Sequence, residues 1–215
     1  MVRWLGGGWG GGFWEGGPPS KQGLEPGLSP VFAEFLSHSF SVPELRFLFL
    51  NVLPDLTDRV LVDVGSRLGA VLFGGHVFSS ASGLVGVELN QDFVTVQNQV
   101  IQKYGFEDRV QVVHSDICSQ DSLVQNADVL VMNNVFEFFL EPPEQIRCWR
   151  FLVQNFRRKG SLLVTVPGLD ESFRQIQEAL PSDWLEELPV NYDLYLTSDS
   201  DQNDCFRQIH LYRVM

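Results

Sequence analysis

The chain has 215 residues, 44% of them hydrophobic and 12% aromatic, which is typical of one globular domain with a sizeable core. Its formal net charge of −12 argues against unaided nucleic-acid binding, because that binding depends on Lys and Arg side chains that neutralise phosphates. No apolar stretch approaches the roughly 20 residues that a membrane-spanning helix needs, so we expect no membrane partner.

The first residues are predicted to form a disordered leader. Residues 1–27 are rich in glycine and contain three prolines, and ordering such a segment has a high entropic cost. They also lack the apolar core of a secretory signal peptide. The cysteines, Cys118, Cys148 and Cys205, fit neither a disulfide framework nor a zinc site by their spacing. These features predict a reducing location, in the cytoplasm, the nucleus or both.

Two helices are expected ahead of the main fold, in a cap over residues 28–56. Ser29 and Pro30 are typical of a helix start, and apolar residues follow on one side. A second helix is expected over residues 43–53, with Ser41 near its start and Pro54 directly after it. These helices could close over a ligand or cover the edge of a sheet, and the sequence favours neither.

A strand, a helix and a second strand are expected over residues 59–64, 68–78 and 84–89. Gly65, Ser66 and Gly69 predict a tight turn between the first strand and the helix. Glu88 lies near the carboxyl end of the second strand. A strand, a glycine turn, a helix and a strand that ends in an acid make up the βαβ unit that binds a nucleotide.

The rest of the chain continues this alternation. A helix is expected to begin at Asn90 or Asp92 and to end at Gly105. Its predicted apolar stripe consists of Phe93, Val96, Val100 and Tyr104. Further strands are expected over residues 109–114, 128–132 and 161–166, and further helices over residues 119–125, from residue 142 and over residues 170–180.

The last two predicted strands, residues 191–197 and 205–214, have only an acidic loop between them and must therefore pair antiparallel. The whole pattern predicts an α/β fold with a doubly wound, mostly parallel sheet and a C-terminal antiparallel hairpin. This Rossmann-like core spans residues 57–215, within a single domain of residues 28–215.

Four motifs, in this order, resemble those of the class I (Rossmann-like) S-adenosyl-L-methionine-dependent methyltransferases. They are the segment 63–69, Glu88, the pair Asp116-Ile117 and the segment Asn133-Asn134-Val135-Phe136. The first matches the D-x-G-x-G-x-G turn of that family, except that Arg67 replaces one glycine. The resemblance covers about residues 59–215, and it implies that S-adenosyl-L-methionine is the cofactor.

The resemblance implies that the cofactor is bound by Asp63, Gly65, Ser66, Gly69, Glu88, Asp116, Ile117 and Asn133. The turn would bring the backbone close to the methionine end, and Glu88 would accept hydrogen bonds from both ribose hydroxyls. Asp116 would accept a hydrogen bond from the adenine amino group, with Ile117 beside the ring. If the turn requires a positive φ at Arg67, arginine is disfavoured there, which argues for a non-catalytic member.

The segment after the fourth strand is the predicted catalytic segment. Asn133, Asn134 and Phe136 resemble the Asn-and-aromatic motifs of several protein N-methyltransferases. In that interpretation an Asn carbonyl orients the target N–H and an aromatic ring packs against the cation. The alternative is that the two asparagines stabilise the loop before the helix at residue 142. No metal site is predicted, because the histidines are scattered without ligand spacing.

The sequence thus predicts a methyltransferase that acts on a nitrogen of a protein substrate. A basic substrate is expected because residues 170–204 contain ten acids and one base, which is either an attractive surface or only a solvated one. The first alternative is a small-molecule methyltransferase. The second is a non-catalytic cofactor-binding scaffold that works through its acidic surface.

Overall fold

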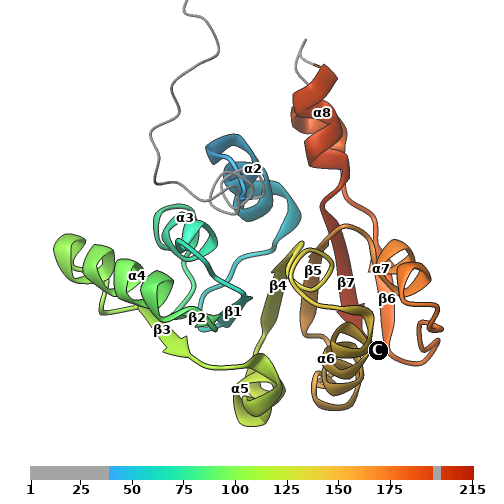
Figure 1. Cartoon of the computed structure of the whole chain (residues 1–215). Helices are drawn as coiled ribbons and strands as arrows, with labels where there is room; N and C mark the ends of the chain where they lie inside the picture. The colour runs from blue at the N-terminus through green and yellow to red at the C-terminus, as the bar shows by residue number, and fades with distance from the viewer. Residues whose placement is uncertain (1–38, 196–199) are drawn as a thin grey trace, which may run out of the picture. The chain divides into compact units, whose positions relative to one another are not determined.

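Seven strands form one sheet in the order β3-β2-β1-β4-β5-β7-β6 (Figure 1). The strands are β1 (Val60–Val64), β2 (Gly83–Glu88), β3 (Val110–His114), β4 (Val129–Asn133), β5 (Leu162–Val166), β6 (Leu185–Leu188) and β7 (His210–Val214). The first five are parallel, and β7 pairs antiparallel with both β5 and β6. The predicted α/β fold, mostly parallel with antiparallel C-terminal strands, is confirmed.

The computed structural model describes residues 39–195 and 200–215. The leader predicted for residues 1–27 and the helix predicted from Ser29 lie outside these ranges. The described residues all belong to one compact unit, Ser37–Met215. Within them, no helix combines the length and the apolar character needed to cross a membrane.

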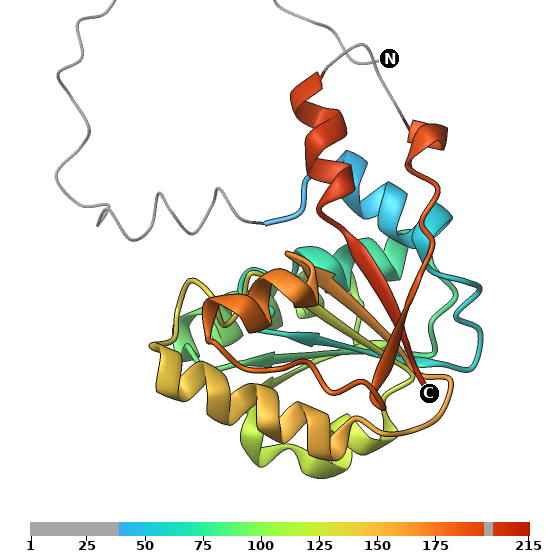
Figure 2. The ribbon, with the colours of Figure 1, turned by 90° about the vertical axis from the view of Figure 1, so that its right-hand side faces the viewer.

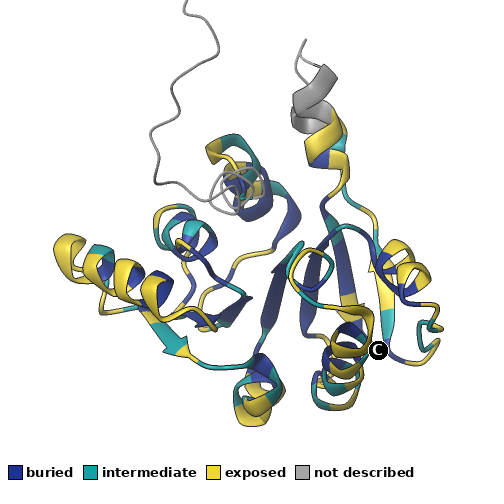
Figure 3. Cartoon of the chain, viewed as in Figure 1, coloured by how far each residue is buried: buried dark blue, intermediate teal, exposed yellow. Residues whose placement is uncertain are grey.

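Helices cover both faces of the sheet, as Figures 1 and 2 show. The helical segments are α2 (Val42–Phe47), η1 (Leu48–Val52), α3 (Ala70–Phe78), α4 (Gln91–Tyr104), η2 (Ile117–Ser119), α5 (Asp121–Asn126), α6 (Pro142–Asn155), α7 (Leu169–Gln175), η3 (Tyr192–Tyr195) and α8 (Ser200–Arg207). One buried cluster contains side chains of α2, η1 and α3, and the other contains side chains of α5, α6 and α7. Strand residues alternate between the clusters, so that Leu61 packs in the first and Val62 in the second. The central strands are therefore buried on both sides (Figure 3).

The second predicted N-terminal helix is present as α2 and its π-helical continuation η1. It begins with a capping box, in which Ser41 and Glu44 satisfy each other's backbone N–H groups. Its side chains pack on α3, where a Cβ at Gly74 or Gly75 would lie 3.1 Å from Leu45 or Phe49, respectively. This helix therefore covers the sheet by packing on α3.

The predicted apolar stripe of α4 is wrong in part. Phe93 is buried as predicted, but Val96 and Tyr104 are exposed, and the helix buries Val94, Gln97 and Ile101 instead. Both sets repeat at helical spacing, so apolar periodicity did not separate them. The helix does begin after Asn90, whose side chain caps it, and it ends at Gly105 with a positive φ, as predicted.

The first strand of the predicted C-terminal hairpin is misplaced. β6 lies at Leu185–Leu188, whereas residues 191–197 include the 3-10 turn η3. Tyr192 is held there because its hydroxyl donates to the backbone carbonyl of Ile209 and its ring lies 6.0 Å from that of Phe47. The second predicted strand, residues 205–214, begins later than expected, since α8 extends to Arg207 and β7 starts at His210. A long connection that includes α8 therefore joins β6 to β7, rather than a tight hairpin turn.

Candidate functional site

The carboxyl ends of β1 to β4 carry predicted site residues to one edge of the sheet. Asp63 lies in β1, Glu88 ends β2, Asp116 follows β3 and Asn133 ends β4. Because β1 lies between β2 and β4, the order of the strands reverses beside it. Ligands of open α/β sheets bind in the crevice at such a reversal, outside the carboxyl ends of the strands.

The turn between β1 and α3 has positive φ at three positions. Gly65 has φ +69°, Arg67 has φ +50° and Gly69 has φ +81°. The backbone N–H groups of Gly65 and Ser66 both donate to the carbonyl of Val87, which ties the turn to β2. The turn thus does require a positive φ at Arg67, where an L-residue is strained by about 1 kcal/mol.

Glu88 is buried, and its carboxylate connects the turn to the end of β2. One oxygen accepts a hydrogen bond from the backbone N–H of Arg67 and the other from that of Asn90, each at 2.8 Å. Each carboxylate oxygen has two lone pairs, so both oxygens can accept one further hydrogen bond. Sequence reasoning missed this bracing role, because an acceptor for two backbone donors leaves no separate signal in the sequence.

Asp63 is buried at the base of the turn. Desolvation raises the pKa of this carboxyl to about 8, the positive charge of Arg67 opposes the shift and the negative charge of Glu88 adds to it. Asp63 is thus mostly neutral at pH 7, unlike an exposed aspartate.

The guanidinium of Arg67 is enclosed beside these acids. Only 8% of the residue is exposed, and neither terminal nitrogen has a hydrogen-bond partner. Its central carbon lies 4.8 Å from the centre of the Phe139 ring. Burial lowers the pKa of Arg67, and the charges of Asp63 and Glu88 oppose that shift. The sequence identified this residue as a departure from the motif but did not indicate its side-chain environment.

Asp116 is held by two donors. Its carboxylate accepts from the backbone N–H of Cys118 at 2.9 Å and from the guanidinium of Arg147 at 3.0 Å. Burial alone would raise the pKa of Asp116, but these hydrogen bonds outweigh burial and the pKa is lowered. Ile117, the predicted neighbour of the adenine ring, is buried in the core.

Two cysteines lie beside Asp116, although they are 30 residues apart in the chain. The thiol of Cys118 donates to the sulfur of Cys148 at 3.3 Å, and this bond raises the pKa of Cys118 and lowers that of Cys148. Together with Asp116, these cysteines place three potential metal-ligand atoms within 4.8 Å of one another. Sequence spacing could not find this group, because η2 and α6 contribute its members separately.

The residues of the predicted catalytic segment lie in different surroundings: Asn133 and Asn134 lie at the end of β4, whereas Phe136 is buried in the core. Asn134 has φ +50°, and its side-chain amide donates to the side-chain oxygen of Asn133 at 3.0 Å. Phe136 is 2% exposed and meets the Trp149 ring edge-on at 5.2 Å in the core. Its expected packing against a substrate is therefore corrected, because a ring enclosed in the core presents no face to a substrate.

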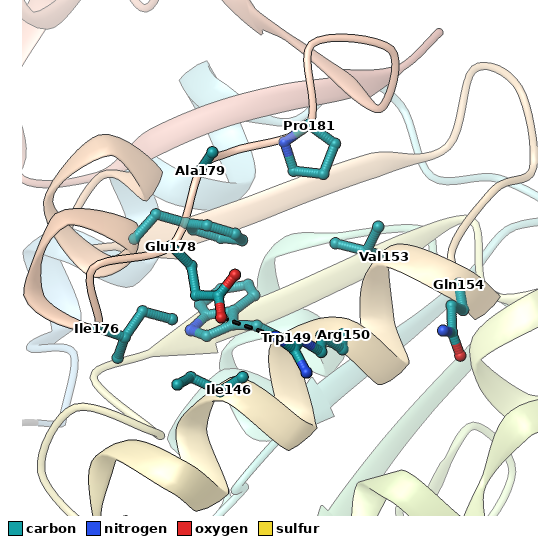
Figure 4. A pocket seen from close by; sticks show the side chains of 10 residues that line it. Ile146, Trp149, Arg150, Val153, Gln154, Ile176, Glu178, Ala179 and Pro181 are labelled. Atoms are coloured by element: carbon teal, nitrogen blue, oxygen red, sulfur yellow. Dashed lines mark hydrogen bonds and ion pairs between the residues drawn. The ribbon is translucent and has the colours of Figure 1, made fainter.

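A separate cavity lies between α6 and residues 176–181 (Figure 4). It has a volume of about 140 Å³ and a largely apolar wall that includes Ile146, Val153 and Ile176. An ion pair of 2.8 Å between Arg150 and Glu178 lies beside it. It contains none of the predicted site residues.

No protein-family model matches the sequence, and no curated protein matches it. Solved methyltransferases do match the structure. An O-methyltransferase from Bacillus cereus, in complex with S-adenosylhomocysteine, is 14% identical with a TM-score of 0.55, and 86% of each chain is covered. A methyltransferase from Geobacter sulfurreducens is 17% identical with a TM-score of 0.54, over 89% of this chain and 93% of that one. An RNA methyltransferase from Salinibacter ruber, also with S-adenosylhomocysteine, is 19% identical with a TM-score of 0.51, over 82% and 92%.

The chain has the fold of the class I methyltransferases. At these identities the likeness concerns the fold, and it confirms the fold that the motifs implied. Whether the cofactor of that fold suits this chain depends on its own residues. Acids at the ends of β1 and β2 and after β3, and a buried guanidinium without a partner, supply acceptors and a donor of the required chemistry.

Space in this class I methyltransferase fold is restricted. The cavity lined by Asp63, Gly65, Arg67 and Asn133 has a volume of about 20 Å³, room for about one water. Val135 lies directly on the turn, since a Cβ at Gly65 would be 2.3 Å from its side chain. The residues present therefore fit the cofactor in chemistry, and the loop between β4 and α6 limits the room for it.

Proposed function

We propose that this protein binds S-adenosylmethionine and transfers its methyl group. The observation that carries the proposal is the carboxylate of Glu88. It is buried at the strand reversal, braced by two backbone donors and left with one acceptor site on each oxygen. Two of the structurally similar methyltransferases were solved with S-adenosylhomocysteine, the product of that cofactor, which supports the same assignment.

The other residues have roles that follow from their positions. Glu88 accepts the ribose hydroxyls, and Asp116, oriented by Arg147, accepts the adenine amino group beside Ile117. The turn from Gly65 to Gly69, with Ser66, contacts the methionine end through its backbone. When bound, the cofactor supplies an electrophilic sulfonium methyl group, and the protein's main contribution is to position the nucleophile.

Binding requires the side chains of Val135 and Phe139 to move. Val135 occupies the space against Gly65, and Phe139 covers Arg67. Both residues belong to the loop between β4 and α6, and Phe139 is 45% exposed on its outer side. Movement of these two side chains would open the site while Phe136, between them in the chain, stays packed in the core.

We further propose a nitrogen of a protein as the methyl acceptor. The support is the Asn133–Asn134 pair at the end of β4, in which one side-chain amide already orients the other. An amide oxygen there can accept a hydrogen bond from a target N–H group. The net charge of −12 disfavours an RNA substrate, although an RNA methyltransferase is among the structural neighbours.

The second candidate is a non-catalytic cofactor-binding scaffold. The presence of Arg67, with its positive φ, in the turn between β1 and α3 favours it. A strained arginine and a cavity of about 20 Å³ are features that reduce affinity for a large cofactor. A small-molecule methyltransferase remains the third candidate, since one neighbour is an O-methyltransferase.

Transfer of a radioactive methyl group from S-adenosylmethionine into hypomethylated cell lysate separates the three candidates. The wild-type chain is compared with Glu88→Ala and with Glu107→Ala, an exposed acid outside the site. A labelled protein band that Glu107→Ala retains and Glu88→Ala loses supports a protein methyltransferase. Label confined to small molecules supports the third candidate. Cofactor binding without any label transfer supports the scaffold.

A further inference from the structure

The guanidinium of Arg67 lacks the partners that a buried charge requires. Both terminal nitrogens are inaccessible to solvent and have no hydrogen-bond partner, and the residue is 8% exposed. A buried donor left unsatisfied costs about 1–3 kcal/mol, and more when it is charged. Groups of this kind in a folded protein call for an explanation such as a ligand that they bind.

The backbone at the same residue is strained. Arg67 has φ +50°, between Gly65 and Gly69, which both have positive φ. Glycine at this position would relieve the strain and remove the buried charge. Arg67 therefore combines a strained backbone with unsatisfied buried donors, at the edge of the sheet where ligands of such folds bind. Strain retained at such a place indicates a functional role for the side chain.

Neither neighbouring acid forms a hydrogen bond with the terminal nitrogens of Arg67, although the charges of Asp63 and Glu88 oppose the lowering of its pKa by burial. Asp63 has a pKa of about 8 and is mostly neutral at pH 7. The oxygens of Glu88 receive backbone N–H groups, one of them from Arg67 itself. Phe139 contributes only the face of its ring, 4.8 Å away. The guanidinium thus has charged neighbours but no hydrogen-bond acceptor for either terminal nitrogen.

We propose that the Arg67 side chain binds the carboxylate at the amino-acid end of the cofactor. This inference rests on the proposed function. Of the groups in S-adenosylmethionine, adenine and ribose are neutral, the sulfonium and ammonium are positive, and the carboxylate alone is negative. A guanidinium matches a carboxylate through two parallel N–H donors, and its free nitrogens are those two. Arg67 also lines the cavity next to Ser66 and Asn133, at the end of the site assigned to methionine.

The test compares two ligands that differ at the amino-acid end. S-adenosylhomocysteine has the carboxylate, whereas 5′-methylthioadenosine lacks the whole amino-acid end and keeps the adenosine. Both are titrated calorimetrically against wild type, Arg67→Met and Arg67→Lys. We expect Arg67→Met to weaken S-adenosylhomocysteine binding by about 10- to 100-fold, as loss of a charged hydrogen bond predicts, with less than about a twofold change for 5′-methylthioadenosine. Arg67→Lys keeps the positive charge but loses the pair of parallel N–H donors. Its affinity for S-adenosylhomocysteine should therefore lie between those of wild type and Arg67→Met.

The outcomes distinguish failure of the Arg67 assignment from failure of the proposed function. Unchanged or tighter S-adenosylhomocysteine binding in Arg67→Met overturns the assignment and makes Arg67 an obstruction. An equal loss for both ligands also overturns it, because Arg67 would then act only through the shape of the turn. If wild type binds neither ligand, the proposed function fails and this inference fails with it. Thermal unfolding of each variant without ligand establishes that it is folded.

Discussion

Asp63 links the stability of the fold to pH. Its carboxyl is buried between the turn and the sheet, and desolvation raises its pKa from 3.8 to about 8. Between these two values the folded state retains a proton that the unfolded state has lost, so stability falls as pH rises and then levels off above about 8. Arg67 and Glu88, the charged groups that act on Asp63, shift the upper limit of this window, the folded-state pKa, in opposite directions: Arg67 lowers it and Glu88 raises it.

Replacing Asp63 with Asn should remove this dependence. The free energy of unfolding of Asp63→Asn, relative to wild type, is expected to increase by more than about 1 kcal/mol between about pH 5 and pH 7, since one pKa unit corresponds to about 1.4 kcal/mol. Denaturant unfolding at a series of pH values measures it. Asp108→Asn, at an exposed aspartate, is the control and should follow wild type. Parallel curves for Asp63→Asn and wild type would show that the carboxyl is not buried as described.

The turn between β1 and α3 depends on glycine for two separable reasons. Gly65 and Gly105 share the same φ of +69°, so alanine is strained equally at both positions. A Cβ at Gly105 meets nothing within 4 Å, whereas one at Gly65 lies 2.3 Å from the side chain of Val135. Comparing alanine at Gly65 with alanine at Gly105 therefore separates the cost of the steric clash from the cost of backbone strain.

We expect Gly105→Ala to lower the free energy of unfolding by about 1 kcal/mol, from strain alone. Gly65→Ala should lose at least about 1 kcal/mol more, because overpacking adds to the strain. In a double-mutant cycle measured by urea unfolding, Val135→Ala should recover part of the loss at Gly65 and none of that at Gly105. Equal losses at the two glycines would mean that Val135 does not rest on the turn.

The elements of the βαβ unit could be predicted because their signals are local. Strand β1 is a short buried run of β-branched residues, and Gly65 and Glu88 lie at fixed places relative to the strands around them. The first C-terminal strand was misplaced because its sequence, LEEL, has only two apolar residues. Residues 191–197 have better strand propensity, but tertiary contacts of Tyr192 hold Tyr192–Tyr195, among the described residues of this stretch, in a 3-10 turn.

The sequence could predict the positions of site residues only where a strand or a motif determines them. Glu88 was predicted from its place at the end of a strand in the βαβ unit, and Asp116 from the resemblance, and both acids lie at the same edge of the sheet. The enclosure of Arg67 by Phe139, and the burial of Phe136 against Trp149, depend on how a loop of the β4–α6 connection packs. Loop packing has no periodicity that a single sequence could reveal.

At the scale of the whole molecule, bases from other elements offset part of the negative charge of the acidic segment, residues 170–204. Ion pairs involve four of its acids, each with a base from another element. These pairs are Arg150–Glu178, Arg157–Asp183, His210–Glu187 and Arg213–Glu186, the third of them charged on both sides only when the histidine is protonated. Exposed acids such as Asp170 and Glu171, both in α7, are the groups that can attract a basic substrate.

If a basic protein is the methyl acceptor, raising the salt concentration should lower kcat/KM severalfold, because steering by exposed charges is screened within about 10 Å at 0.1 M salt. The double variant Asp170→Asn, Glu171→Gln should show lower kcat/KM at low salt and a weaker salt dependence. Asp92→Asn, at an exposed acid of α4, is the control. A kcat/KM that does not depend on salt contradicts a basic substrate and favours a small neutral one.

In the proposed function, the acid at the end of β2 binds the ribose of an adenosyl cofactor. Calorimetric titration of S-adenosylmethionine into wild type and Glu88→Ala tests it most directly, with thermal unfolding to confirm that the variant folds despite losing the bonds to Arg67 and Asn90. We expect saturable binding to wild type that Glu88→Ala weakens by about 10- to 100-fold, because hydrogen bonds to a charged group contribute about 1.5–3 kcal/mol. Absence of binding to wild type, or a change of less than about twofold in the variant, which is well under the roughly 1.4 kcal/mol of a tenfold change, would contradict it.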